Sequence, residues 1–232
     1  MAERYAVVSC HVEWPLDDRA WERFARLQAR FRIAALMRPP DKAAGEDPQL
    51  WLERARLAAT QGPLGHHTHW GGPSQARPLG GDPAERVRRE GAWLREQGLT
   101  PTLFCGGGWY VDAEVATAAA ELGYADCSAT AFTPSYLPPD APRLAAEAPC
   151  RLALPDGGEL LELPTTHSLG MLARALLRGL GERYVHVYFH DTDLLDARRA
   201  AVLRLCLAAL GQRGRDVANL RPAELPRLEP WA

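Results

Sequence analysis

Long apolar runs are absent from this sequence of 232 residues: none approaches the ~18 consecutive apolar residues of a membrane span. The segment Met1–Tyr5 also lacks the basic and then apolar regions of a secretory signal. Positive charge is not in excess, since the formal net charge is −2, and nothing in it favours nucleic acid or an acidic membrane as a partner. We therefore expect a cytoplasmic protein that binds neither nucleic acid nor membranes.

Paired cysteines are lacking as well. The five cysteines are an odd number at irregular spacing, without a Cys-x-x-Cys pair. This pattern points neither to a disulfide framework nor to a cysteine zinc site, and free, mostly buried thiols are expected. The three glycines Gly106–Gly108 are not followed by Gly-Lys-Ser/Thr, which excludes a phosphate-binding loop.

What the sequence does contain is a regular alternation of short apolar runs and helical patterns. The length favours one domain over residues 1–232, and the alternation predicts an α/β fold with a mostly parallel sheet. A proline-rich stretch, Phe132–Gly158, is expected to be an irregular loop insertion. The expected strands are Tyr5–Cys10, Arg32–Met37, Pro63–His67, Thr102–Cys105, Gly123–Ala129, Leu160–Pro164 and Tyr184–Phe189. The expected helices are Asp18–Arg30, Asp47–Ala59, Asp82–Gln97, Asp112–Leu122, Ser168–Leu180 and Leu195–Leu210.

All seven histidines lie on or just after expected strands and none in an expected helix. Binding groups of parallel α/β folds collect at the C-terminal ends of the strands, whether the sheet is open or closed into a barrel. This placement predicts that the histidines gather in one site. They are His11, His66, His67, His69, His167, His186 and His190.

The segment Gly65–Pro73 contains the pair His67 and His69, which are two residues apart and so face the same side of a strand. Two imidazoles on one face suit a zinc-type site, which needs a third protein ligand. The end of the first strand offers His11 and Glu13 for that place. Taken alone, either pair could instead stabilise a loop.

The last expected strand places His186, Tyr188 and His190 on one face. A histidine of ordinary pKa can donate or accept protons, and His190 is the candidate general acid, whereas His186 is better explained as a hydrogen-bonded core residue.

Aromatic and glycine residues also follow strand ends. Trp70 and Trp109, like Trp14, could stack on a sugar ring or pack under loops. Gly107 lies in the glycine turn, which could present backbone amides to a ligand. We predict that Trp70, Gly107 and Trp109 bind substrate, a small molecule or an oligosaccharide.

The order of these segments resembles the polysaccharide deacetylase (NodB-homology) family over nearly the whole chain. The resemblance implies a distorted seven-stranded (β/α) barrel of TIM-barrel type, one divalent metal (zinc or another transition metal) and hydrolysis of N- or O-acetyl groups on sugars. The segments that carry it are Gly65–Trp70, Phe104–Trp109, Gly123–Ser128 and Val187–His190.

Three positions depart from the family pattern. His11 stands where the family has its catalytic-base aspartate, Gly71 where it has a distal histidine, and Cys105 where it has an arginine that orients the base. The resemblance, read with these replacements, implies Glu13, His67 and His69 as metal ligands, with His11 as base and His190 as acid. The alternatives are a catalytically inactive carbohydrate-binding barrel and a different, two-metal hydrolase on a TIM-like barrel.

Overall fold

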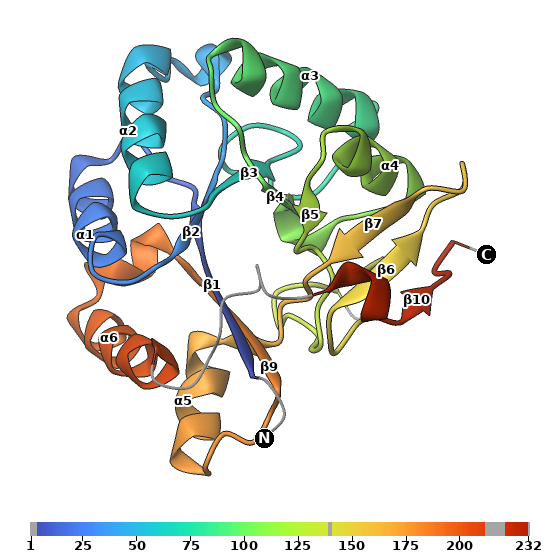
Figure 1. Ribbon diagram of the computed structural model, residues 1–232. Coiled ribbons are helices and arrows are strands. Elements are labelled where there is room, and N and C mark those ends of the chain that lie inside the picture. Colours follow the sequence, from blue (N-terminus) through green and yellow to red (C-terminus); the bar gives the residue numbers. More distant parts are fainter. Residues whose placement is uncertain (1–3, 139–140, 212–220, 232) are drawn as a thin grey trace.

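The computed structural model describes residues 4–138, 141–211 and 221–231. Within these residues one sheet of ten strands has the order β10-β6-β7-β5-β4-β3-β2-β1-β9-β8, with helices on its outer side (Figure 1). The strand pairs are parallel except for β6 with β7. The strands are β1 (Tyr5–Val12), β2 (Ala34–Met37), β3 (Leu64–Thr68), β4 (Leu103–Gly106), β5 (Ala125–Asp126), β6 (Cys150–Ala153), β7 (Glu159–Glu162), β8 (His167–Ser168), β9 (Tyr184–His190) and β10 (Arg227–Leu228).

The six α-helices follow the strands as the sequence predicts. All six begin after a side chain that accepts a hydrogen bond from a backbone N–H of the first turn. The caps of the first two are Asp17 and Asp47, so the first helix is capped one residue earlier than its expected start at Asp18. The helices are α1 (Asp18–Gln28), α2 (Pro48–Gln61), α3 (Pro83–Glu96), α4 (Ala113–Glu121), α5 (Leu169–Leu177) and α6 (Ala197–Gly211).

Two apolar clusters join the helices to the sheet. One packs Phe24 of α1 and Trp51 of α2 against β1, β2 and α6. The other packs Val115 and neighbouring residues of α4 against Phe104 of β4. The candidate site lies at the C-terminal ends of β1, β3 and β9.

The predicted number of seven strands is wrong, because ten strands are present among the described residues. Inside the expected loop Phe132–Gly158, whose residues 139 and 140 lie outside the described part, Cys150–Ala153 forms β6. The turn at Gly157, with φ of +86°, returns the chain to pair β6 antiparallel with β7. This hairpin was not predicted, because the many prolines nearby are typical of an irregular loop. β5 is shorter than expected, because the N–H of Ser128 bonds to the side chain of Asp126 instead of a neighbouring strand.

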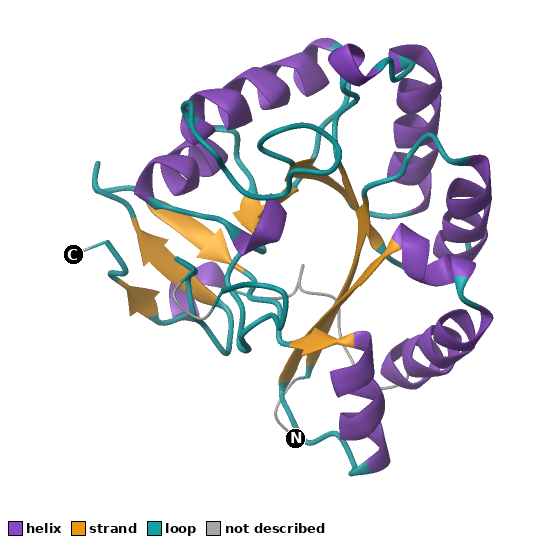
Figure 2. Ribbon diagram, turned by 180° about the vertical axis from the view of Figure 1, so that it is seen from behind, coloured by secondary structure: helices purple, strands orange, loops and turns teal. Residues whose placement is uncertain are grey.

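The sheet curves around the centre of the molecule (Figure 2). The chain from β7 to β8 contacts both β5 and β9: Leu163 N donates to Asp126 O at 2.8 Å, and Thr166 N donates to His186 O at 2.9 Å. This geometry agrees with a largely parallel α/β sheet, and complete closure into a barrel stays a prediction. No helix in the described ranges is long and apolar enough to cross a membrane.

His186 is a buried core residue, as the sequence indicates. Its Nδ1 donates to Leu163 O at 2.9 Å, and its Nε2 accepts from the Ser9 hydroxyl at 2.8 Å. Burial lowers the pKa of His186 to about 4, because the charged ring would lose its hydration, although the bond to Leu163 O opposes this shift.

We predict that His186 makes the fold less stable in acid. Above pH 6.5 the ring is neutral in the folded and in the unfolded protein. Between pH 6.5 and about pH 4 only the unfolded chain binds the proton, so the free energy of unfolding falls as the pH is lowered. The loss attributable to this group is roughly 3 kcal/mol. Urea unfolding at pH 7, 5.5 and 4.5 measures it, with His186→Gln as comparison. A variant whose stability falls as steeply as the wild type's would contradict the assignment.

Candidate metal centre

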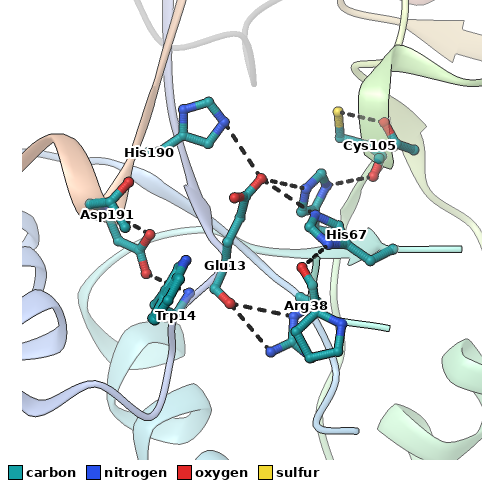
Figure 3. A network of polar contacts seen from close by, with 12 residues as sticks. Glu13, Trp14, Arg38, His67, Cys105, His190 and Asp191 are labelled. Carbon is teal, nitrogen blue, oxygen red and sulfur yellow. Dashed lines mark hydrogen bonds and ion pairs between the residues drawn. The ribbon is translucent and has the colours of Figure 1, made fainter. Parts of the chain in front are cut away.

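Glu13 lies at the centre of a group of histidines at the C-terminal ends of three strands. Its Oε1 atom is 3.4 Å from His69 Nε2, 3.5 Å from His190 Nε2 and 3.8 Å from His67 Nε2 (Figure 3). It follows β1, while His67 is the next-to-last residue of β3, His69 lies just beyond β3 and His190 ends β9. The structure therefore brings together the three residues predicted as metal ligands and the predicted acid.

The rings of His67 and His69 are fixed by backbone carbonyls. His67 Nδ1 lies 2.8 Å from Cys105 O, and His69 Nδ1 lies 2.7 Å from Pro73 O. A carbonyl only accepts, so Nδ1 carries the proton in both rings and Nε2 keeps its lone pair. Both Nε2 atoms are buried without a hydrogen-bond partner. Hydrogen bonding of this kind on the far nitrogen is typical of metal-ligating histidines.

The spacing fits a divalent cation better than direct hydrogen bonds. Contacts of 3.4 and 3.8 Å between Glu13 and the two imidazoles are long for hydrogen bonds. Ligand atoms at about 2.0–2.1 Å from a tetrahedral metal lie about 3.3 Å apart, close to this spacing. One carboxylate and two neutral imidazoles are donors that zinc and similar metals accept. The residues present thus fit one metal ion.

The electrostatics of the site favour an ionised Glu13. Burial raises the pKa of Glu13, but its contacts with His67 and His69 and the nearby His190 outweigh this and hold the pKa well below its usual range. Burial, together with the neighbouring His69, lowers the pKa of His67 in spite of Glu13. The carboxylate is consequently charged and the imidazole neutral at pH 7, the states required of ligands.

The backbone around Glu13 is held by two residues that sequence reasoning missed. Asp191 Oδ2 accepts from Trp14 N at 2.9 Å, and Arg38 Nη2 and Nε donate to Glu13 O at 3.3 and 3.4 Å (Figure 3). Arg38 is itself anchored on Glu46, with Nη1 2.9 Å from Oε2. Both follow strand ends, Arg38 after β2 and Asp191 after β9, which was the available signal.

His11 and His190 are register partners in the pairing of β1 with β9. His11 is only 4% exposed, its Nε2 has no hydrogen-bond partner, and its ring centroid lies 4.5 Å from that of His67. Burial lowers the pKa of His11 far below its ordinary value, and His67 and His190 lower it further. His190 is more open, with 31% of its side chain exposed, and it borders a cavity of about 460 Å³.

The donor atoms can be grouped in more than one way. Among the described residues there are three sets in which one donor atom of each residue lies within 4.8 Å of the others. They are Glu13, His67 and His69; His11, Glu13 and His190; and His11, His67 and Cys105. The first is the set predicted from the sequence. His66 points away from all of them and contacts Glu90 Oε2 at 2.9 Å, as strand alternation predicts.

The predicted substrate-binding residues lie below the surface of the site. Trp70 is 7% exposed and Trp109 is 2% exposed. A Cβ atom on Gly107 would lie 2.4 Å from Ala76 O, so the glycine is required for close backbone packing. A substrate-binding role for these three stays a prediction. Trp14, 60% exposed and adjacent to Glu13, is the tryptophan at the rim.

No family model matches the sequence, and no curated protein is similar enough to count as a match. Solved structures share the fold at low identity. A 4-alpha-glucanotransferase from Thermococcus litoralis has a TM-score of 0.58 at 11% identity over 99% of this chain, which spans only 40% of that protein. A CE4 family pseudoenzyme from Bacillus anthracis has a TM-score of 0.53 at 9% identity over 97% of this chain and 67% of its own. A family 4 carbohydrate esterase from Streptomyces lividans, in complex with acetate, has a TM-score of 0.51 at 12% identity and 93% coverage of both chains.

These likenesses establish the fold and not the reaction. Two of the three neighbours belong to carbohydrate esterase family 4. One of those two is a pseudoenzyme. The third is named for a different reaction. The choice among these activities depends on the side chains of the site.

Proposed function

We propose that this chain is a divalent-metal-dependent hydrolase that removes N- or O-acetyl groups from a sugar-containing substrate. The observation that carries the proposal is the convergence of two imidazole Nε2 atoms on the ionised Glu13, with the Nδ1 of each ring held by a carbonyl. The sequence motifs favour deacetylation as the reaction, and the shared fold of the family 4 carbohydrate esterase from Streptomyces lividans agrees with it.

Glu13, His67 and His69 would hold the metal, for which zinc is the first choice. A bound divalent cation would polarise the acyl carbonyl and make an attacking water more acidic. Glu13 supplies the negative charge that balances the cation, and Arg38 and Asp191 keep its backbone in place. The neutral rings of His67 and His69 contribute lone pairs without adding charge.

Proton transfer falls to His11 and His190. His11, kept neutral by burial, would accept a proton from the attacking water at Nε2, the atom that has no partner in the structure. His190 lies between Glu13 and the open cavity, so it would donate a proton to the leaving oxygen or nitrogen of the sugar. The cavity, bordered by Tyr188 and Leu169 among others, would hold the sugar on the leaving side.

A second candidate function is a carbohydrate-binding protein without catalysis. The specific observation in its favour is the enclosure of His11 by the rings of His67, Trp109 and Tyr188, whose centroids lie 4.5, 5.1 and 5.4 Å away. A base so enclosed reaches water less readily than an exposed carboxylate does.

Metal analysis and acetate release distinguish the two functions. We expect the protein, purified without chelator, to contain about one equivalent of divalent metal and to release acetate from acetylated amino-sugar oligomers. Glu13→Gln should lose both properties. Metal without acetate release would favour the binding protein, and a chain that neither contains nor takes up metal would contradict the proposed hydrolase.

A further inference from the structure

The carbonyl that orients His67 belongs to a peptide unit that is itself held from the other side. Cys105 O accepts from His67 Nδ1 at 2.8 Å (Figure 3), and Gly106 N, in the same peptide unit, donates to Ser128 Oγ at 2.8 Å. A side chain at Gly106 is impossible, since a Cβ there would lie 2.0 Å from Tyr110 O. The peptide therefore has one orientation, fixed at both its oxygen and its nitrogen.

Ser128 is held in turn by a buried carboxylate. Its hydroxyl donates to Asp126 Oδ1 at 2.6 Å, and the same oxygen accepts from the N–H groups of Cys127 and Ser128 at 2.8 and 3.0 Å. Both Ser128 and Asp126 are 0% exposed. Because the single hydroxyl proton of Ser128 points to Asp126, its oxygen is left to accept from Gly106 N.

A second buried carboxyl group, Glu162, completes the network. It is 0% exposed and lies opposite Asp126 in the pairing of β5 with β7. Burial raises the pKa of Glu162 well above its ordinary value, and the charge of Asp126 raises it further. Asp126 Oδ2 and Glu162 Oε2 are both buried with no other hydrogen-bond partner, and two adjacent buried carboxylates cannot both be charged, so Glu162 keeps a proton that it shares with Asp126. Asp126 remains the acceptor that orients Ser128.

We propose that Ser128, Asp126 and Glu162 are positioning residues for the ligand His67, acting through the single peptide unit between Cys105 and Gly106. This inference rests on the proposed metal site. Donation from Gly106 N to Ser128 polarises the peptide and makes Cys105 O a stronger acceptor, which holds the proton of His67 on Nδ1 and its Nε2 lone pair toward Glu13. None of the three residues touches the metal ligands themselves.

Zinc affinity of the full chain tests the proposal. Ser128→Ala should weaken zinc binding about 10-fold, at the lower end of what outer partners of metal ligands contribute. Ser9→Ala is the matched control, because Ser9 is also a fully buried hydroxyl with a 2.8 Å bond to a histidine, His186, that is not a ligand. Its zinc affinity should equal that of the wild type. Urea unfolding of both variants measures their losses of stability, which we expect to be comparable.

Replacements of Glu162 test whether its carboxyl group is protonated and acts as a donor to Asp126. Glu162→Gln still offers a donor to Asp126 and should keep the zinc affinity, whereas Glu162→Leu should lose affinity as Ser128→Ala does. Equal affinities for Ser128→Ala and Ser9→Ala would overturn the proposal.

A measurement without metal separates this proposal from the metal site itself. Nitrogen-15 NMR of the metal-free protein reports which ring nitrogen of His67 carries the proton. We expect Nδ1–H in the wild type and Ser9→Ala, and a mixture of both forms in Ser128→Ala. If the wild type binds no divalent metal, the proposed function is wrong, and this spectrum still decides: an unchanged His67 in Ser128→Ala would overturn the positioning role.

Discussion

Replacing either His67 or His69 with alanine should reduce the affinity of the protein for zinc by more than about 100-fold, since each removes one of three protein donors. Both side chains are nearly inaccessible to solvent, at 1% and 3% exposure, so no water replaces the lost imidazole without rearrangement of the site. Isothermal titration of the metal-free protein with zinc measures the effect. The same variants should lose any acetate release in parallel with the metal.

The matched control for this experiment is His167→Ala. His167 is also buried, at 8% exposure, and also lies on a strand, β8, but its Nδ1 contacts Thr166 Oγ1 at 2.8 Å. Among the described residues it belongs to none of the sets of donors that could share a metal. Its loss should destabilise the fold without changing zinc affinity. If His67→Ala and His69→Ala bind zinc as His167→Ala does, the paired histidines serve structure instead.

The sequence was sufficient to predict which side chains lie together in the candidate site, because strand geometry is regular. The two-residue period places His67 and His69 on one face and His66 on the other, where it contacts Glu90. Because the strands are parallel, the end of β1 lies beside the end of β9. The end of β3 lies on the other side of β1, with β2 between them. Glu13 and His190 are therefore 3.5 Å apart although 177 positions separate them in the chain.

What the sequence could not predict depends on pairing between distant segments. Arg38 and Asp191 follow strand ends, but that position does not reveal that their side chains bind the backbone of Glu13 and Trp14. The Asp126 and Glu162 pair requires the register of β5 with β7, and β7 is reached only after the hairpin with β6 that the prolines concealed. Helices were predicted to within a few residues, because their caps and periodicity are local signals.

Removing His11 should separate its role from that of the ligands. His11→Ala should lower kcat for acetate release by about 100- to 10,000-fold, the contribution of a general base, while zinc affinity stays close to that of the wild type. The reason is geometric. His67 and His69 already present Nε2 atoms to Glu13 with their Nδ1 atoms bonded to carbonyls, whereas His11 has no carbonyl partner among the hydrogen bonds of the described residues.

The opposite result would reassign His11. His11 also belongs to a set of donors with Glu13 and His190, in which one ligand atom of each residue lies within 4.8 Å of the others. If His11→Ala loses zinc and His67→Ala keeps it, the metal lies between β1 and β9, and His190 becomes a ligand that cannot donate a proton. An unchanged kcat in His11→Ala would instead show that His11 only packs beneath the site. Zinc titration and acetate release measured on the same preparation therefore distinguish a base, a ligand and a structural residue.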